Sequence, residues 1–107
     1  SLSFGLTHLN TVERRKINRE RLQETVQRAQ AEFFPKLQRA AGFVGFSLVT
    51  DEENSINTAI VVWGDKTQAD AFYSQGGESW LQTLEDLGHT LQSDNRGETV
   101  IQLDPQK

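Results

Sequence analysis

Two apolar runs near the centre of the chain constrain its fold more than any other feature. They are FVGFSLV at residues 43–49 and TAIVVW at residues 58–63, and the polar segment TDEENSIN at residues 50–57 joins them. Runs of β-branched and aromatic residues bounded by turn-forming residues are typical of strands, and a short polar connection is typical of an antiparallel hairpin. The sequence therefore predicts a central hairpin whose second strand ends at Trp63.

The segment before this hairpin, residues 18–39, has the period of a helix. Apolar residues recur at steps of three and four, which places them on one helical stripe: Leu22, Val26, Ala29, Phe33, Leu37 and Ala40. Pro35 removes a helical hydrogen bond, so we expect a kink or break near Phe33-Phe34. We expect Gly42 to end the helix.

The segment after the hairpin also predicts a helix. Thr67 is the expected N-cap, with Asp65 favourable near the helix start and Asp70 at the capping-box position. We expect an interruption at Gly76-Gly77. The apolar residues of the continuation are Trp80, Leu81, Leu84, Leu87 and Leu91.

The two ends of the chain complete the pattern. Residues 2–12 alternate as a strand, with polar His8 and Asn10 on an otherwise apolar face. Residues 93–98 predict a loop and residues 99–103 a last strand. The order β-α-β-β-α-β predicts an α+β, ferredoxin-like fold over residues 1–107, a single domain in which two helices cover one face of an antiparallel sheet.

The strand at residues 43–49 is apolar on both of its faces, and helices can bury only one of them. A second copy packed against the open face would bury the other. We therefore expect a homodimer that forms through the sheet.

The charge and the residue content of the chain limit the classes of partner that it can bind. A formal net charge of −4 argues against a general nucleic-acid binder, although residues 13–39 hold eight of the eleven Lys and Arg residues. We expect Arg14-Arg15-Lys16 to be a solvated turn, with anion binding as the alternative. No apolar run has the length of a membrane span. The chain has no cysteine, and the reducing cytoplasm is the default compartment.

The stretch FFPKLQRAAGFVGFSLVTDEENSINTAIVVWGDKTQADAF resembles the antibiotic-biosynthesis-monooxygenase-like domains of the dimeric α/β-barrel superfamily. The matching motifs are Ala41-Gly42-Phe43-Val44-Gly45, the acidic hairpin, and Trp63-Gly64-Asp65 before the second helix. The resemblance implies a dimeric α/β barrel with a ligand pocket between sheet and helices.

Two functional branches of that superfamily can be compared with these residues. Resemblance to haem-degrading members would require an Asn on the first strand, as Asn10, and a Trp and a His on one face of the second helix. Trp80 and His89 are nine residues apart and do not share a face closely. Resemblance to quinone-forming members would require Trp63 and an Asn four residues before it, where Ala59 stands.

The first functional hypothesis is an oxygenase that needs no metal or bound cofactor and acts on a small aromatic or polyketide-like substrate. His8 would be the base and Asn10 the hydrogen-bond donor. The walls of the pocket would be Phe34, Trp63, Tyr73 and Trp80. A small hydrophobic or aromatic ligand is thus the expected partner beside a second copy.

Each of these residues also has a structural interpretation. His8 and Asn10 would be ordinary surface residues at a solvated strand end, and Trp63 would cap the core. His89 would act as a cation at a helix C-terminus. The second hypothesis is accordingly a non-catalytic binding or regulatory module of the same fold, with haem as a lesser variant of the ligand.

Overall fold

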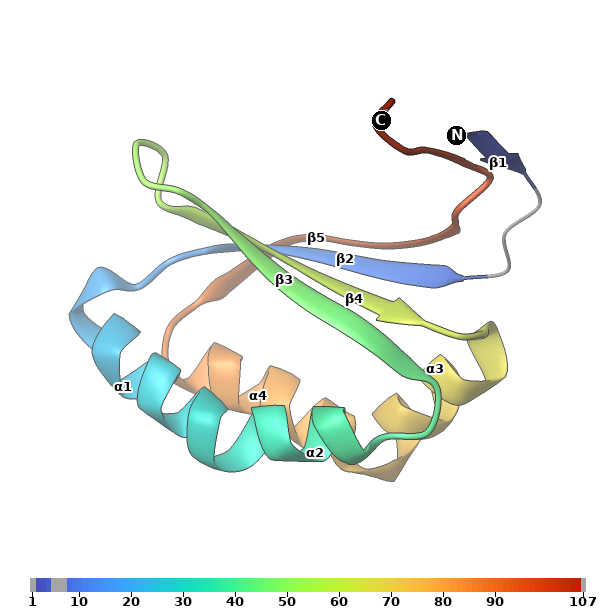
Figure 1. Cartoon of the computed structure of the whole chain (residues 1–107). Coiled ribbons are helices and arrows are strands. Elements are labelled where there is room, and N and C mark those ends of the chain that lie inside the picture. The colour runs from blue at the N-terminus through green and yellow to red at the C-terminus, as the bar shows by residue number, and fades with distance from the viewer. Residues whose placement is uncertain (1, 5–7, 107) are drawn as a thin grey trace.

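A four-stranded antiparallel sheet forms one layer of the molecule, and two interrupted helices form the other. The structure is a computed structural model that describes residues 2–4 and 8–106. The sheet has the order β3-β4-β2-β5. Its strands are β2 (Leu9–Lys16), β3 (Phe43–Asp51), β4 (Ile56–Trp63) and β5 (Thr90–Glu98). All the helices lie on one face of this sheet (Figure 1). The predicted α+β, ferredoxin-like fold and its central hairpin are confirmed.

The first helical layer consists of α1 (Leu22–Arg28) and α2 (Phe34–Arg39), after a 3₁₀ turn at Arg19–Arg21. A π-helical turn, Ala29–Phe33, joins α1 to α2, so the interruption predicted near Phe33-Phe34 is present. Pro35 lies in the first turn of α2, where its missing N–H costs little.

One member of the predicted apolar stripe, Val26, is 45% exposed, and Thr25 is buried in its place. The buried positions Thr25, Ala29, Phe33 and Leu37 are spaced by four residues. In a continuous α-helix each step of four turns about 40° beyond a full circle, so the last position would leave the core. The wider π-helical turn absorbs this drift and keeps all four residues on one face.

The second helical layer consists of α3 (Lys66–Phe72) and α4 (Glu78–Asp86), joined by a π-helical turn at Tyr73–Gly77. The interruption predicted at Gly76-Gly77 is therefore present, and Gly76 has a positive φ of 120°. The predicted N-cap is wrong: the Asp65 carboxylate, not Thr67, accepts the Gln68 N–H at 2.9 Å. Asp65 is extended and precedes the helix, whereas Thr67 already lies within it.

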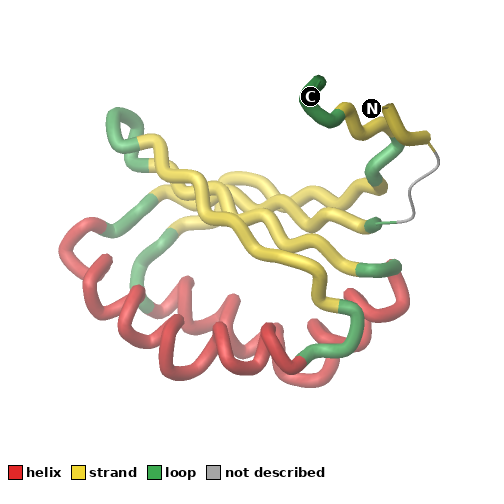
Figure 2. The backbone as a smooth tube through the Cα atoms, viewed as in Figure 1, coloured by secondary structure: helices red, strands yellow, loops and turns green. Residues whose placement is uncertain are grey.

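The chain ends differ from the predicted pattern. The predicted strand 2–12 is two strands, β1 (Leu2–Phe4) and β2, and residues 5–7 between them lie outside the described part of the chain. β1 pairs with β6 (Ile101–Leu103) in a separate two-stranded ribbon near both chain ends (Figure 2).

The loop predicted at 93–98 is wrong, since these residues belong to β5, and Leu91 also lies on β5 instead of a helix. β5 is an edge strand and carries few apolar residues, which is why its sequence resembles a loop.

Strand register divides the sheet side chains into two sets. Leu9 lies opposite Trp63, and Thr11 lies opposite Val61. Leu9, Val61 and Trp63 belong to the core that packs against the helices, with Leu37 and Ala69. Because side chains alternate along a strand, the odd-numbered residues of β2 and β4 face the helices and the even-numbered ones face away. No helix in the described part of the chain is long and apolar enough to span a membrane.

Candidate functional site

A cavity of about 230 Å³ lies between the sheet and the helices. β2, β3 and β4 contribute its floor, and both helical layers contribute its walls. The residues that line it are Thr11, Glu13, Arg15, Ile17, Leu22, Thr25, Val26, Ala29, Phe33, Phe34, Phe46, Leu48, Asn57, Ala59, Val61, Tyr73, Trp80, Leu81, Leu84 and His89.

Four aromatic rings form one wall of this cavity. Phe33 stacks on Trp80 with ring centroids 5.2 Å apart and planes 8° apart. Phe46 contacts Phe33 edge-on at 6.3 Å and Phe34 at 5.4 Å. Phe33 is the last residue of the π-helical turn and Phe34 is the first residue of α2, so both lie at the interruption. Stacked, tilted and edge-on aromatic pairs of this kind stabilise one another beyond the area they bury, and they make this wall of the cavity apolar.

Trp63 is placed differently from the other predicted wall residues. Phe34, Tyr73 and Trp80 line the cavity, whereas Trp63 is 0% exposed and does not. Its ring packs against Phe43 and Phe72 in the core. The contact with substrate that the sequence predicted for Trp63 stays a prediction, and the structural role as a core residue is the one its neighbours support.

The strand β2 brings a charged pair into the cavity floor. Arg15 is 7% exposed, and its Nε donates to Glu13 Oε1 at 2.6 Å. Its Nη1 donates to Glu85 Oε1 at 2.8 Å and to the His89 carbonyl at 2.9 Å. Burial lowers the pKa of Arg15, but the hydrogen bonds to Glu13 and Glu85 outweigh burial and the pKa is raised overall. Arg15 is therefore a fixed cation in a largely apolar cavity.

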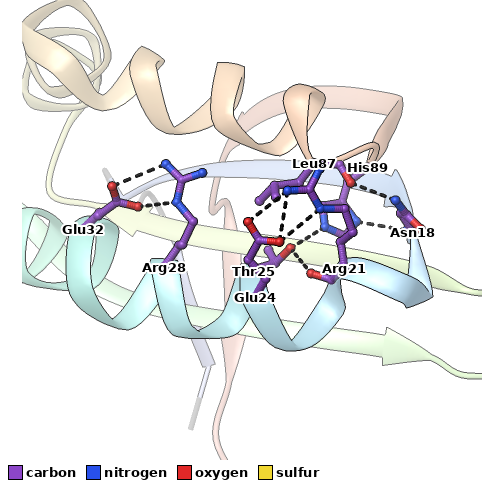
Figure 3. Close-up of polar contacts among 8 residues, drawn as sticks. All are labelled: Asn18, Arg21, Glu24, Thr25, Arg28, Glu32, Leu87 and His89. Carbon is purple, nitrogen blue, oxygen red and sulfur yellow. Dashed lines mark hydrogen bonds and ion pairs between the residues drawn. The ribbon is translucent and has the colours of Figure 1, made fainter.

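His89 joins the start of the first helical layer to the end of α4 (Figure 3). Its Nδ1 accepts the Asn18 backbone N–H at 3.0 Å, so Nε2 carries the proton and donates to Thr25 Oγ1 at 2.6 Å. Thr25 in turn donates to the Arg21 carbonyl at 2.7 Å. The side-chain amide of Asn18 donates to the Leu87 carbonyl at 2.9 Å and so satisfies a carbonyl at the end of α4.

The expectation that His89 is a helix C-terminal cation is wrong. His89 is 4% exposed, and burial lowers its pKa, as do the charges of Arg15 and Arg21. Protonation of Nδ1 would also break the hydrogen bond from Asn18. The ring is thus neutral near pH 7. Both ring nitrogens have partners, so His89 as placed offers no free nitrogen to haem iron.

Tyr73 lies where the cavity meets a more polar opening lined by residues of β2, β5 and the second helical layer. Its hydroxyl is 3.2 Å from Thr11 Oγ1, and the Arg96 guanidinium lies 5.3 Å from its ring centroid. Arg96 Nη1 donates to Asp70 Oδ1 at 2.5 Å. Burial raises the pKa of Tyr73, and the hydrogen bond with Thr11 and the charge of Arg96 offset this only partly. Tyr73 is therefore a protonated hydrogen-bond donor near pH 7.

The predicted base and donor lie away from the cavity. The Asn10 side chain is on the sheet face opposite the helices and donates to Thr99 Oγ1 at 2.8 Å and to the Gly97 carbonyl at 3.3 Å. His8 lies just before β2, and its carbonyl accepts the Thr99 N–H at 3.0 Å. Neither lines the cavity. Their catalytic roles stay predictions, without a contact that links them to this space.

The predicted first strand ended at residue 12, so Glu13 was not predicted in the site, and Arg15 was considered only as part of a turn that could bind an anion. The signal was present: Leu9, Thr11, Glu13 and Arg15 are spaced by two, as in a continuous strand. Arg15 is buried and paired, so the expected solvated turn at Arg14-Arg15-Lys16 is wrong. Within residues 2–4 and 8–106, no group of three or more His, Asp or Glu side chains could hold a metal ion.

The fold and its cavity define a ferredoxin-like α+β domain with a ligand-sized space between sheet and helices. Solved structures share this fold. A conserved protein from Methanosarcina mazei matches with a TM-score of 0.69 and 14% identity over 91% of this chain and 92% of that one. A protein from Bordetella bronchiseptica described as "Putative antibiotic biosynthesis monooxygenase" matches with a TM-score of 0.67 and 16% identity over 88% and 98%.

SnoaB from Streptomyces nogalater, a cofactor-independent oxygenase, matches with a TM-score of 0.62 and 18% identity over 94% of this chain and 96% of that one. No protein-family model and no curated protein matches the sequence. The resemblance to antibiotic-biosynthesis-monooxygenase-like domains is thereby confirmed at the level of the fold.

Proposed function

We propose that this protein is a monooxygenase that needs no bound cofactor and oxidises a small aromatic or polyketide-like substrate in the cavity. The observation that carries the proposal is the combination of an aromatic wall with one carboxylate–guanidinium pair, Glu13–Arg15, in its floor. An apolar wall excludes water and binds an aromatic body, while the pair supplies a proton acceptor and a fixed positive charge. SnoaB, which has the same fold, is described as an oxygenase of this kind.

The chemistry requires a substrate that becomes an electron-rich anion. A C–H or O–H bond of the neutral substrate breaks, its proton goes to Glu13, and the electron pair stays on the substrate beside Arg15. This anion passes one electron to dioxygen, and the two radicals join through a new C–O bond. The peroxide anion that results takes the proton back from Glu13 and becomes a hydroperoxide. Where a ring CH₂ reacts, loss of water from the resulting hydroperoxide leaves a carbonyl, so one oxygen atom enters the product and the other leaves as water.

Glu13 is the proton acceptor because the two other titratable candidates in the cavity, His89 and Tyr73, cannot accept a proton as placed. His89 uses Nδ1 to accept from Asn18, and Tyr73 is protonated. Glu13 accepts from Arg15 through Oε1, and its Oε2 has no hydrogen-bond partner in the described part of the chain. A base must have such a free acceptor within reach of the bound ligand.

Oxygen uptake with a panel of anthrones and phenols tests the proposal. We expect uptake by the wild type and a loss of about 100-fold or more in Glu13→Gln, the scale of a general base. Glu53→Gln, in the exposed hairpin turn, is the matched control and should retain full activity. His8→Ala tests the first-strand base predicted from the sequence. A loss in His8→Ala together with full activity in Glu13→Gln would reject the assignment to Glu13.

The second hypothesis, a binding module without chemistry, has a distinct outcome in the same experiment. Such a module would bind the aromatic compounds by calorimetry and consume no oxygen with any of them. Its haem variant is tested by adding hemin: a shift of the Soret band in the wild type that is lost in His89→Ala would require His89 to leave both of its present partners.

A further inference from the structure

Arg15 has hydrogen-bonding capacity that the protein does not use. A guanidinium has five N–H groups. Nε donates to Glu13, and Nη1 donates to Glu85 and to the His89 carbonyl. Nη2 donates to no group in the described part of the chain, although the whole side chain is only 8% exposed. Nη2 is therefore free to donate to a ligand in the cavity that Arg15 lines.

The strand register places Arg15 beside the aromatic wall. Phe46 lies opposite Val61, which lies opposite Thr11, so the aromatic wall is level with Thr11. Glu13 and Arg15 occupy the next two helix-facing positions of β2. A flat ligand against the aromatic wall would therefore extend one of its ends toward Arg15.

The charges around Arg15 determine whether an anionic or a neutral oxygen group of the ligand can bind beside it. Two carboxylates, Glu13 and Glu85, bond to one guanidinium, which leaves the cluster with an excess of negative charge. A carboxylate or phosphate on the ligand would be repelled mainly by Glu13, which lines the cavity and has a side chain only 15% exposed, whereas solvent screens the 47% exposed Glu85. A neutral carbonyl or hydroxyl oxygen accepts from Nη2 without this repulsion.

We propose that Arg15 is the specificity-determining residue of the cavity, and that it selects aromatic ligands with a neutral carbonyl or hydroxyl oxygen over aromatic carboxylates. The inference rests on the proposed function for the aromatic character of the ligand. It also agrees with the proton transfer to Glu13, because a ligand that enters neutral acquires its negative charge only beside Arg15.

Calorimetric titration with 1-naphthol and 1-naphthoate at pH 7 tests the proposal, because the two probes share a ring system and differ in charge. The wild type should bind naphthol at least tenfold more tightly than naphthoate. Arg15→Met should weaken naphthol binding about tenfold or more, the scale of one hydrogen bond to a charged donor. Arg14→Met is the matched control, since Arg14 is the neighbouring residue on the opposite sheet face, and it should leave both affinities unchanged.

Two further variants complete the design. Arg15→Lys keeps the charge but not the fork of donors, and it replaces Arg15→Met if circular dichroism shows that variant to be unfolded. Glu85→Gln keeps an acceptor for Arg15 and removes one negative charge, so naphthoate binding should strengthen several-fold while naphthol binding changes little.

The inference is overturned if the folded Arg15 variants bind naphthol as the wild type does, if naphthoate binds as tightly as naphthol, or if neither probe binds. No step of this test uses turnover. Naphthol binding that depends on Arg15, in a protein that consumes no oxygen, would refute the monooxygenase and leave the specificity inference standing.

Discussion

The charge state of His89 is set by its neighbours and not by its position after a helix. From the sequence alone, a histidine that follows Gly88 predicts a solvated helix end. The positive φ of Gly88 instead turns the chain so that His89 enters the protein, where Asn18 and Thr25 use both ring nitrogens. Its partner Asn18 is 71 residues away in the chain, a proximity that no local pattern reveals.

A pH dependence of stability follows from this neutral histidine. The pKa of His89 is lowered in the folded protein, so the unfolded chain binds more protons in the range between the folded pKa and the ordinary value of about 6.5. The contribution is fully present above pH 6.5 and is lost as the pH falls below it, by at most about 1.4 kcal/mol per pH unit.

Urea unfolding followed by tryptophan fluorescence at pH 7.5, 6.0 and 5.0 measures this dependence. The wild type should lose free energy of unfolding across the series, and His89→Gln, which does not titrate, should lose less. Parallel decreases in the two proteins would show that His89 does not carry the effect.

At the scale of the elements, the two π-helical turns show which features of the helices could be predicted from the sequence. Pro35 and Gly76-Gly77 marked both interruptions, because proline and glycine disturb a helix by local stereochemistry. The side of the helix that faces the core could not be predicted across these turns, because a π-helical turn rotates the residues that follow it. Val26 was therefore assigned to the core in place of Thr25. β5 was missed for a different reason: an edge strand is held by its backbone pairing with β2 and needs little apolar surface.

Gly76 supplies a test of the second interruption. Its φ of 120° is a conformation that L-residues rarely adopt, and a Cβ there would meet no atom within 4 Å, so the cost of Gly76→Ala is one of backbone strain alone. We expect a loss of about 1–3 kcal/mol in the free energy of unfolding. Gly45→Ala, where the added Cβ also meets nothing, is the control without a positive φ. Equal melting temperatures for the two variants would contradict the expected strain.

At the scale of the whole molecule, no helix among residues 2–4 and 8–106 covers the sheet face opposite α1–α4, and only the β1–β6 ribbon stands on that side, at one end (Figure 1). This sheet face carries Val12, Val49, Ile60 and Val62, and Val49 is exposed. We propose that a second copy covers this face, as the two-sided apolar pattern of residues 43–49 predicted. An interface on the order of 2,000 Å² in total would place the pair among stable homodimers, and C2 symmetry is the default arrangement.

Sedimentation at micromolar concentration tests this pairing. The wild type should sediment at twice its monomer mass of 12.1 kDa. Ile60→Asp places a charge in the proposed interface and should give a monomer or an aggregate, whereas Gln30→Asp on the exposed side of the first helical layer should leave the dimer intact. A stable wild-type monomer would exclude the interface.

The alternation of side chains along β2 and β4 has a practical consequence for engineering. Within residues 9–16 and 56–63, odd positions face the cavity and core, and even positions face the side of the sheet away from the helices. A combinatorial library confined to positions 11, 57 and 59 would thus vary the lining of the cavity while Glu13 and the proposed dimer interface stay constant. Randomising positions 12, 58, 60 and 62 would do the reverse. The two properties can be evolved separately, although their codons interleave along the same few strands.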